Sequence, residues 1–291
     1  MICNLCPRNC NALRTDTKGG GLCGMPALPV AARAALHQWE GPPISGTRGG
    51  GTLFFSGCPL QSVFCHSELI SHQGRGTVII PEHLRALCFQ LIVQGAHNIN
   101  FVPPTHYTHV LLDVLREPLP VPVVWNTGGY EKLETLRALE GKVDIYLPDL
   151  KYLNADVAQR YSAAPDYPEV ATAAILEMFR QVGPVEYAAD GTLKKGVIIR
   201  HLVLPGQLSG AKDVMDWVAE HFAPGQVLFS LMSQYLPWGK AAEYPEINRR
   251  LRKGEARKAA EYMELLGLDG FVQEQSAASD QFIPDFDFTG L

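Results

Sequence analysis

The stretch TLFFSGCPLQSVFCHS, residues 52 to 67, joins a short apolar run to a loop that carries two cysteines. The run ends at Gly57, which is typical of a buried strand followed by a turn. In the loop, Cys58 and Cys65 stand seven positions apart, and Ser62 lies between them. Such a loop indicates a metal site, a metal site that lacks one ligand, or two cysteines brought together by coincidence. The choice among these three decides the function.

Short apolar runs followed by amphipathic stretches recur along the rest of the chain. The further predicted strands are NINFV (98–102), VPVVWN (121–126), VDIYLPD (143–149), GVIIRHLVL (196–204) and QVLFSLMSQ (226–234). Helical patterns lie between them, such as residues 81–95, which start at Pro81 and stop at Gly95, and residues 130–141, which stop at Gly141. A strand followed by a helix six times over predicts a parallel sheet.

The predicted fold class is α/β, with a partial (β/α)6 TIM-like barrel and a small cysteine-rich N-terminal head that binds metal. A doubly wound open sheet is the competing arrangement. Its phosphate fingerprint, GxGxxG at the start of a helix, is not where it should be, because GTRGGGT (46–52) precedes a strand. We therefore favour the barrel, with residues 1–45 as the head and residues 46–291 as the barrel.

Composition narrows the function classes. The chain has 291 residues, of which 46% are hydrophobic and 19% charged, so it can bury a large core. The formal net charge of −5 gives no electrostatic footprint for nucleic acid. The start, MICNLCPRNC, lacks the apolar stretch of a signal peptide. No continuous apolar run is long enough to span a membrane. We therefore expect a cytoplasmic protein without a membrane partner.

Four of the seven cysteines form a separate constellation in the head. Cys3, Cys6, Cys10 and Cys23 read C-x2-C-x3-C-x12-C, and glycines around residues 19–24 supply tight turns between them. Four thiolates at such spacing can hold tetrahedral zinc or a second iron–sulfur cluster. Disulfides are disfavoured in a cytoplasmic chain. The sequence therefore predicts metal in the head, with zinc slightly favoured.

Polar residues and glycines follow the ends of the later predicted strands. The candidate binding residues are Asn126, Gly128, Asp149, Lys151, Arg200 and His201. Because the carboxyl ends of the strands meet at one mouth of a barrel, we expect these residues to form one site. The alternative is that strand ends are polar because they meet solvent, with Asp149 and Lys151 as an ordinary ion pair.

Several motifs resemble the radical SAM superfamily, in particular the branch similar to pyruvate formate-lyase activating enzyme. They are CNLCPRNC, LHQWEGPPISG, QGAHNIN, NTGGY, DIYLPDLKY, YSAAPDYPEV, IRHLVLPG and SLMSQY, and they run nearly the whole length of the chain. The resemblance implies a (β/α)6 partial barrel and a 4Fe-4S cluster held by three cysteines, C-x3-C-x2-C, directly after the first strand. It also implies S-adenosyl-L-methionine (SAM) on the open iron of that cluster, cleaved to a 5′-deoxyadenosyl radical that abstracts hydrogen from a substrate.

The resemblance also assigns the SAM pocket to the six strand-end residues. Arg200 or Lys151 suits a carboxylate, and Asn126 or Asp149 suits the ribose hydroxyls. A glycyl-radical protein or another protein substrate, together with an electron donor, would be the partners. No catalytic residue is identified.

The cluster motif matches at Cys58 and Cys65 and departs at its middle position, Ser62. Iron–sulfur clusters use soft thiolate ligands, whereas a serine hydroxyl is a hard donor that keeps its proton at neutral pH. Two hypotheses follow. The chain is a radical enzyme in which Ser62 or His66 replaces the missing thiolate. Alternatively, it is a non-catalytic relative that keeps the fold, with or without the SAM pocket, and acts as a scaffold or regulatory binder.

Overall fold

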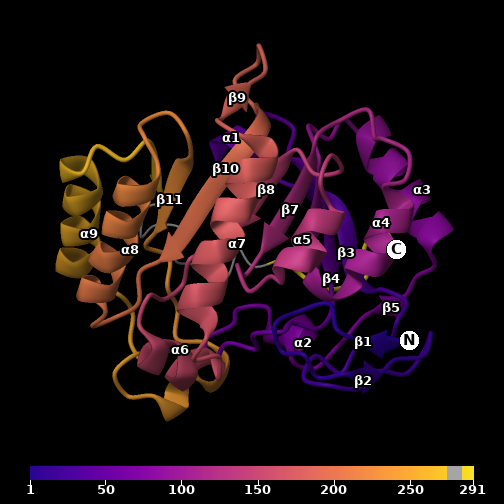
Figure 1. Ribbon diagram of the computed structural model, residues 1–291, viewed down its shortest axis with the longest axis horizontal. Helices are drawn as coiled ribbons and strands as arrows, with labels where there is room; N and C mark the ends of the chain where they lie inside the picture. Colours follow the sequence, from indigo (N-terminus) through magenta and orange to yellow (C-terminus); the bar gives the residue numbers. More distant parts are fainter. Residues whose placement is uncertain (274–283) are drawn as a thin grey trace.

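The computed structural model describes residues 1–273 and 284–291, and its main feature is one large sheet (Figure 1). In the described residues the sheet has ten strands. The order across it is β12 (Gly270–Gln273), β11 (Leu228–Met232), β10 (Leu193–Leu202), β8 (Ile145–Pro148), β7 (Val123–Thr127), β6 (Ile99–Val102), β4 (Gly50–Phe55), β3 (Val30–His37) and β5 (Thr77–Val78), with β9 (Glu186–Tyr187) paired to β10. All neighbours from β4 to β12 are parallel, and β3 runs antiparallel to β4.

The longer helices lie on one face of this sheet. They are α3 (Pro81–Val93), α4 (Thr108–Val114), α5 (Leu133–Ala138), α6 (Ala155–Ser162), α7 (Tyr167–Val182), α8 (Leu208–His221) and α9 (Lys253–Leu265). Strand side chains alternate between the two faces, so Trp125 and Ile199 join the helix-side core, while Val124 and Ile198 join a separate cluster with Ile44. We call this second side the inner face.

Ile44 lies in the short helix α1 (Pro42–Ser45). A doubly wound sheet carries helices on both faces, so the one-sided helix layer excludes that alternative. The structure has an α/β fold with a mostly parallel sheet. The closure of this sheet into a partial barrel stays a prediction.

The strands and helices expected from the sequence are present. Pro81 starts α3, and Gly95, just beyond its end, has φ +97°, a backbone conformation that side chains rarely adopt. Two strands of the sheet, β3 and β12, were not predicted. The β3 sequence, VAARAALH, is rich in alanine and lacks the β-branched run of a typical strand, and only tertiary pairing with β4 makes it one. β3 lies within residues 1–45, so the range predicted as the head includes one strand of the large sheet. The division into a head and a barrel stays a prediction.

The head packs directly against the sheet. Its β1 (Ile2–Cys3) and β2 (Ala12–Leu13) form a small antiparallel hairpin. Arg14 follows the hairpin and is fully buried, where its Nη1 donates to the carbonyl oxygen of His106 at 2.7 Å. His106 belongs to the short helix Thr105–Tyr107 after β6, so the head is fastened to the carboxyl end of the sheet. Two further short helices are α2 (Glu68–Ser71) and Gly239–Glu243.

No helix in the described parts of the chain is both long and apolar enough for a membrane crossing.

Candidate functional site

A cavity of about 320 Å³ opens at the carboxyl ends of the parallel strands. One side of it is the cysteine loop, residues 57–67, which contributes Cys58, Ser62 and Cys65. The strand ends form the other side. They contribute Asn126, Gly128, Asp149, Lys151 and Arg200. The structure therefore brings together the cysteine loop and all but one of the predicted pocket residues.

The exception is His201, which does not line this cavity. Consecutive side chains of a strand point to opposite faces, so Arg200 points to the inner face and His201 points to the helix side. There its Nδ1 donates to the carbonyl oxygen of Leu150 at 2.7 Å. Burial lowers the pKa of His201 to about 4, so the ring is neutral at physiological pH. His201 therefore has a structural role. Because side chains alternate along a strand, the sequence could have predicted that His201 and Arg200 lie on opposite faces.

Arg200 is the centre of a charged network beside the cavity. Its Nε donates to Asp149 Oδ1 at 2.8 Å and its Nη2 donates to Asn126 Oδ1 at 2.7 Å. Its Nη1 donates to Glu40 Oε2 at 3.0 Å. Lys151 Nζ donates to Asp149 Oδ2 at 2.5 Å. We refer to Glu40, Asn126, Asp149, Lys151 and Arg200 as the Arg200 network.

Burial alone would raise the pKa of Asp149, but the charges of Arg200 and Lys151 hold it below its ordinary value. Asp149 is therefore ionised at neutral pH. The network contains two carboxylates and two cations, so the two kinds of charge balance.

Glu40 was not among the predicted site residues. It lies between β3 and α1 and reaches Arg200 from the far end of the sheet. Its Oε1 accepts from Asn126 Nδ2 at 3.0 Å and from Asn100 Nδ2 at 3.3 Å, and its side chain is only 10% exposed. Glu40 lies in LHQWEGPPISG, one of the motifs that resemble the family. A charged residue between Trp39 and Gly41 in that motif could have identified Glu40 as a site residue.

Two buried polar atoms near the network have no hydrogen-bond partner. They are Asn100 Oδ1 and Ser230 Oγ, and Ser230 lies opposite Arg200 in the β10–β11 ladder. Buried polar atoms are normally paired, so unpaired ones at the inner face are consistent with a ligand or water that completes them. This observation fits a polar small molecule bound at the strand ends.

The cysteine loop supplies two thiols to the cavity. Burial is the main cause that raises the pKa of both Cys58 and Cys65, and each thiol is free in the structure. Ser62 Oγ instead shares a hydrogen bond of 2.8 Å with Ser162 Oγ at the end of α6. Ser162 Oγ also pairs with the hydroxyl of Tyr152 at 3.1 Å. The hydroxyl at the middle motif position is thus committed to a buried chain of three hydroxyl groups.

These contacts test whether the loop fits a three-cysteine cluster. Within residues 1–273 and 284–291, no three His, Cys, Asp or Glu side chains approach one another closely enough to hold a metal. A cluster with three protein ligands needs three soft donors, and the loop offers only two thiols. Its other polar groups on the cavity include the hydrogen-bonded hydroxyl of Ser62 and the imidazole of His66, whose Nε2 donates to the carbonyl oxygen of Leu236 at 3.3 Å. The residues present therefore do not fit the cluster that the resemblance implies.

The position of Ser162 follows from local sequence. Asn154 caps α6, since its side chain accepts from the backbone N–H groups of Asp156 and Val157 at 2.9 and 3.0 Å. The helix ends at Ala163, which has a left-handed φ of +46°. The resulting turn holds the Ser162 hydroxyl against the cysteine loop.

The head also holds the cysteine loop in place. Arg8 Nε donates to the carbonyl oxygen of Pro59 at 2.8 Å, and its Nη2 donates to that of Ser162 at 2.7 Å. Gln61 Nε2 donates to the carbonyl oxygen of Leu22 at 2.8 Å. The head and the loop therefore form one connected structure.

The four head cysteines are free thiols, and within residues 1–273 and 284–291 no three of them converge closely enough to hold a metal. They are Cys3, Cys6, Cys10 and Cys23. Burial raises the pKa of Cys6 to about 12, and the other three thiols add smaller contributions. Gly21 has φ +74°, and a Cβ atom there would lie 2.6 Å from Cys10 Sγ, so glycine is required where the chain passes this thiol. Metal in the head stays a prediction, because it requires the thiols to lose their protons and converge.

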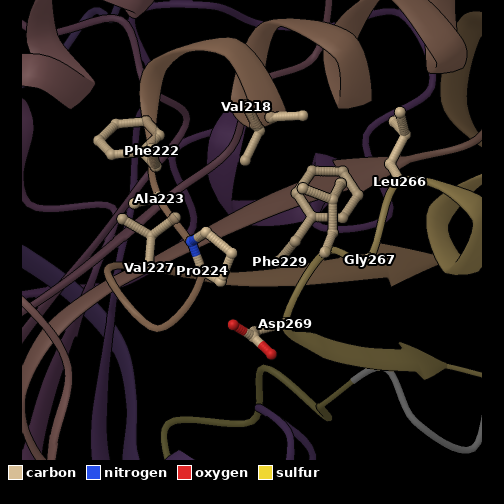
Figure 2. Close-up of a pocket in the computed structure, with 11 residues that line it drawn as sticks. Val218, Phe222, Ala223, Pro224, Val227, Phe229, Leu266, Gly267 and Asp269 are labelled. Atoms are coloured by element: carbon tan, nitrogen blue, oxygen red, sulfur yellow. The ribbon is translucent and has the colours of Figure 1, made fainter.

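A second, smaller cavity has a different set of lining residues (Figure 2). It has a volume of about 60 Å³ between α8, β11 and the turn before β12, and its wall is mostly apolar, with Phe222 and Phe229. Asp269 in this wall accepts a hydrogen bond from the backbone N–H of Gly225 at 2.6 Å. None of the predicted site residues lines this cavity, so we regard it as a packing void.

Comparison with known proteins yields no matching family model. The chain is 32% identical over 229 residues to MJ0674, an uncharacterised protein of Methanocaldococcus jannaschii, and the match covers 75% of this chain. The chain spans 63% of the length of that relative.

Solved structures with a similar fold include a radical SAM methyltransferase and a protein bound to S-adenosylmethionine. A radical SAM methyltransferase from Sphaerobacter thermophilus has a TM-score of 0.50 at 13% identity, with 77% of this chain and 66% of that chain covered. SuiB of Streptococcus suis, bound to S-adenosylmethionine, has a TM-score of 0.53 at 15% identity, with 75% of this chain and 48% of that chain covered. At this level of identity, the likeness shows that the chain has the same fold as these proteins.

Proposed function

We propose that the chain binds S-adenosylmethionine at the strand ends and is a member of the pyruvate formate-lyase activating enzyme-like branch of the radical SAM superfamily. One observation carries this proposal. A single cavity is lined by the cysteine loop, which the resemblance assigns to the cluster, and by five of the six residues that it assigns to the SAM pocket, namely Asn126, Gly128, Asp149, Lys151 and Arg200. Its volume of about 320 Å³ lies within the usual range for small-molecule sites.

The cavity offers groups that suit the parts of SAM. Asp149 and Asn126 suit the ribose hydroxyls or the ammonium group. Phe64, Leu202 and Met232 line the cavity and provide an apolar wall for adenine.

The hydrogen-bond partners of Arg200 help to choose between Arg200 and Lys151 as the residue that binds the SAM carboxylate. Arg200 already donates to Asp149, Glu40 and Asn126. Lys151 uses one of its three donors on Asp149 and has the others for a ligand. We therefore assign the carboxylate to Lys151 and a positioning role to Arg200.

We further propose that the cluster site is incomplete, which favours the non-catalytic alternative, a SAM-binding scaffold or regulatory protein. The supporting observation is the Ser62–Ser162 hydrogen bond, because a hydroxyl engaged in a buried network is a poorer metal ligand than a free one. The radical-generating enzyme is the second candidate, supported by Cys58 and Cys65 on the same cavity. Only that candidate requires an electron donor and a glycyl-radical or other protein substrate.

Ligand-induced stabilisation tests SAM binding. At a hundredfold excess over its Kd, SAM should stabilise the folded chain by about 2.7 kcal/mol, which is measurable as a rise in melting temperature. Asp149→Asn should reduce this rise, whereas Asp156→Asn, an exposed acid on the nearby helix α6, should preserve it. No stabilisation of the unmodified chain at millimolar SAM would contradict the proposal.

For the head we propose one structural metal, zinc before a second iron–sulfur cluster, supported by the C-x2-C-x3-C-x12-C spacing of its four cysteines. Purified protein should contain about one equivalent of metal per chain in the head, and Cys6→Ser should release it and lower the melting temperature. Cys88→Ala removes a buried thiol from α3 and should leave the metal content unchanged. Full stability in the metal-free protein would contradict a structural site.

A further inference from the structure

The segment from Asp149 to Lys151 follows β8 and contributes both of these side chains to the cavity. It lies beyond the end of the strand, so its backbone groups need partners outside the regular ladder. The N–H of Asp149 donates to the carbonyl oxygen of Thr127 at 2.9 Å, and the N–H of Leu150 donates to that of Arg200 at 2.8 Å. The carbonyl oxygen of Asp149 and the N–H of Lys151 have a different partner.

That partner is the hydroxyl group of Tyr167. It accepts from the N–H of Lys151 at 3.0 Å and donates to the carbonyl oxygen of Asp149 at 2.7 Å. The carbonyl oxygen of Gly128 lies 2.9 Å from the same hydroxyl and shares its hydrogen. Tyr167 is fully buried, and burial raises the pKa of its hydroxyl well above the ordinary value, so the hydroxyl keeps its proton. Tyr167 therefore joins the segment after β8 to the turn after β7.

The turn after β7 is shaped for this contact. Gly129 has φ +79°, and a Cβ atom there would overlap the carbonyl oxygen of Asp149 and lie 3.0 Å from the hydroxyl of Tyr167. A Cβ atom on Gly128 would lie 2.8 Å from Leu60 of the cysteine loop. Two glycines therefore let the turn approach both the segment after β8 and the cysteine loop.

The ring of Tyr167 is itself held in place. Tyr167 is the first residue of α7, and Asp166 before it accepts from the hydroxyl of Tyr130 at 2.8 Å. The ring of Tyr167 stacks on that of Tyr130, with 6.1 Å between their centroids, and meets that of Tyr152 edge to face at 5.5 Å. Its hydroxyl is therefore a fixed point beneath the cavity.

The ammonium group of Lys151 depends on this fixed point. Lys151 Nζ donates to Asp149 Oδ2 at 2.5 Å, and the two side chains are only 19% and 13% exposed. Tyr167 holds the backbone of both residues. A small shift of that backbone would move Nζ relative to a bound ligand, and shifts of about 1 Å are enough to weaken a charged contact strongly.

We propose that Tyr167 is a positioning residue that makes the cavity select adenosyl ligands with a carboxylate. It acts through Lys151, to which the proposed function assigns the SAM carboxylate, and the inference rests on that function. With the Tyr167 hydroxyl in place, the remaining donors of Lys151 are directed at one position in the cavity. Without it, the N–H of Lys151 loses its acceptor, and the ammonium group loses its support.

Two ligands that differ by one group test the proposal. They are SAM and decarboxylated SAM, which has a hydrogen atom in place of the carboxylate, and their Kd values are measured by calorimetry. The unmodified chain should prefer SAM, and Lys151→Met should reduce this preference by about tenfold or more. Tyr167→Phe removes only the hydroxyl group and should reduce the preference at least about fivefold, with the Kd of decarboxylated SAM unchanged.

Tyr107→Phe is the matched control. Tyr107 is also fully buried, its hydroxyl accepts from the backbone N–H of Val30 at 3.2 Å, and it is not among the residues that line the cavity. This variant should have a lower melting temperature and an unchanged preference for SAM. The proposal is overturned if Tyr167→Phe keeps the preference of the unmodified chain, if it weakens both ligands equally, or if the unmodified chain binds both ligands equally well.

Hydrogen exchange separates this inference from the proposed function, because it needs no ligand. The amide of Lys151 should exchange at least about fivefold faster in Tyr167→Phe than in the unmodified chain. The amide of Leu150, which donates to Arg200, should change little. Equal changes at the two amides would overturn the inference even if SAM binds. If the unmodified chain binds neither ligand but only the Lys151 amide responds, the proposed function fails and the role of Tyr167 in holding Lys151 stands.

Discussion

The Arg200 network and the cysteine loop face the same cavity, and they differ in completeness. In the network, each of the three guanidinium nitrogens of Arg200 donates to an acceptor, and Asp149 accepts from both Arg200 and Lys151. In the loop, the motif has two thiols, and the hydroxyl of Ser62 at its middle position is hydrogen-bonded to that of Ser162. The Arg200 network and the cysteine loop can therefore differ in whether they still bind a ligand. Ligand binding can persist at the strand ends although the loop lacks a ligand.

The largest expected effect is on the network. Arg200→Ala leaves Glu40 and Asp149 as buried carboxylates without their main cation, which should cost about 3–5 kcal/mol in the free energy of unfolding, measured by urea denaturation. Arg257→Ala is the control, because Arg257 bonds Glu261 and the two side chains are 69% and 56% exposed. An exposed pair is worth at most about 1 kcal/mol. Equal losses in the two variants would contradict a buried network.

The next largest effect is the pH dependence of the unfolding free energy that His201 causes, on the face of β10 opposite to Arg200. Burial lowers the pKa of His201 from 6.5 to about 4, so the unfolded chain takes up this proton first as the pH falls. The stability due to neutral His201 is complete above pH 6.5 and is lost as the pH falls towards 4, by about 3 kcal/mol in total.

His201→Asn, which retains a donor for Leu150, should flatten the pH dependence of the unfolding free energy over this range. His221→Asn, at the exposed end of α8, is the control and should leave the curve unchanged. An unchanged slope in His201→Asn would mean that His201 is accessible to protons in the folded chain.

The smallest effect concerns the hydroxyl chain of the loop. Ser62→Ala removes the bond to Ser162 and should cost about 1 kcal/mol in urea unfolding. Ser67→Ala, a serine in the same loop but outside the hydroxyl chain, should cost less. If Ser62→Ala leaves stability unchanged, the hydroxyl of Ser62 is free to act as a ligand, and the contrast with the Arg200 network weakens.

Much of the cavity was predictable from sequence, because it depends on local patterns. Apolar runs fix the strands, and parallel strands bring their carboxyl ends together, so Asn126, Asp149 and Arg200 meet at one place. The same reasoning placed His201 there, since it used strand ends and ignored the alternation of faces.

The remaining features depend on contacts between distant parts of the chain. Glu40 reaches Arg200 across 160 positions, and Ser62 meets Ser162 across 100. No periodicity or spacing encodes such pairs. The β3 strand was missed for a related reason, since its alanines become a strand only through pairing with β4.

The most direct test of the central claim is a side-by-side anaerobic reconstitution of the unmodified chain and Ser62→Cys. Ser67→Cys, which adds a thiol to the same loop outside the motif, is the control. Iron and sulfide bound beyond the head are measured first, followed by 5′-deoxyadenosine formed from SAM under strong reductant. The account predicts little cluster and little 5′-deoxyadenosine for the unmodified chain and Ser67→Cys, and a clear gain of cluster in Ser62→Cys. SAM cleavage by the unmodified chain at the rate of Ser62→Cys would contradict the account.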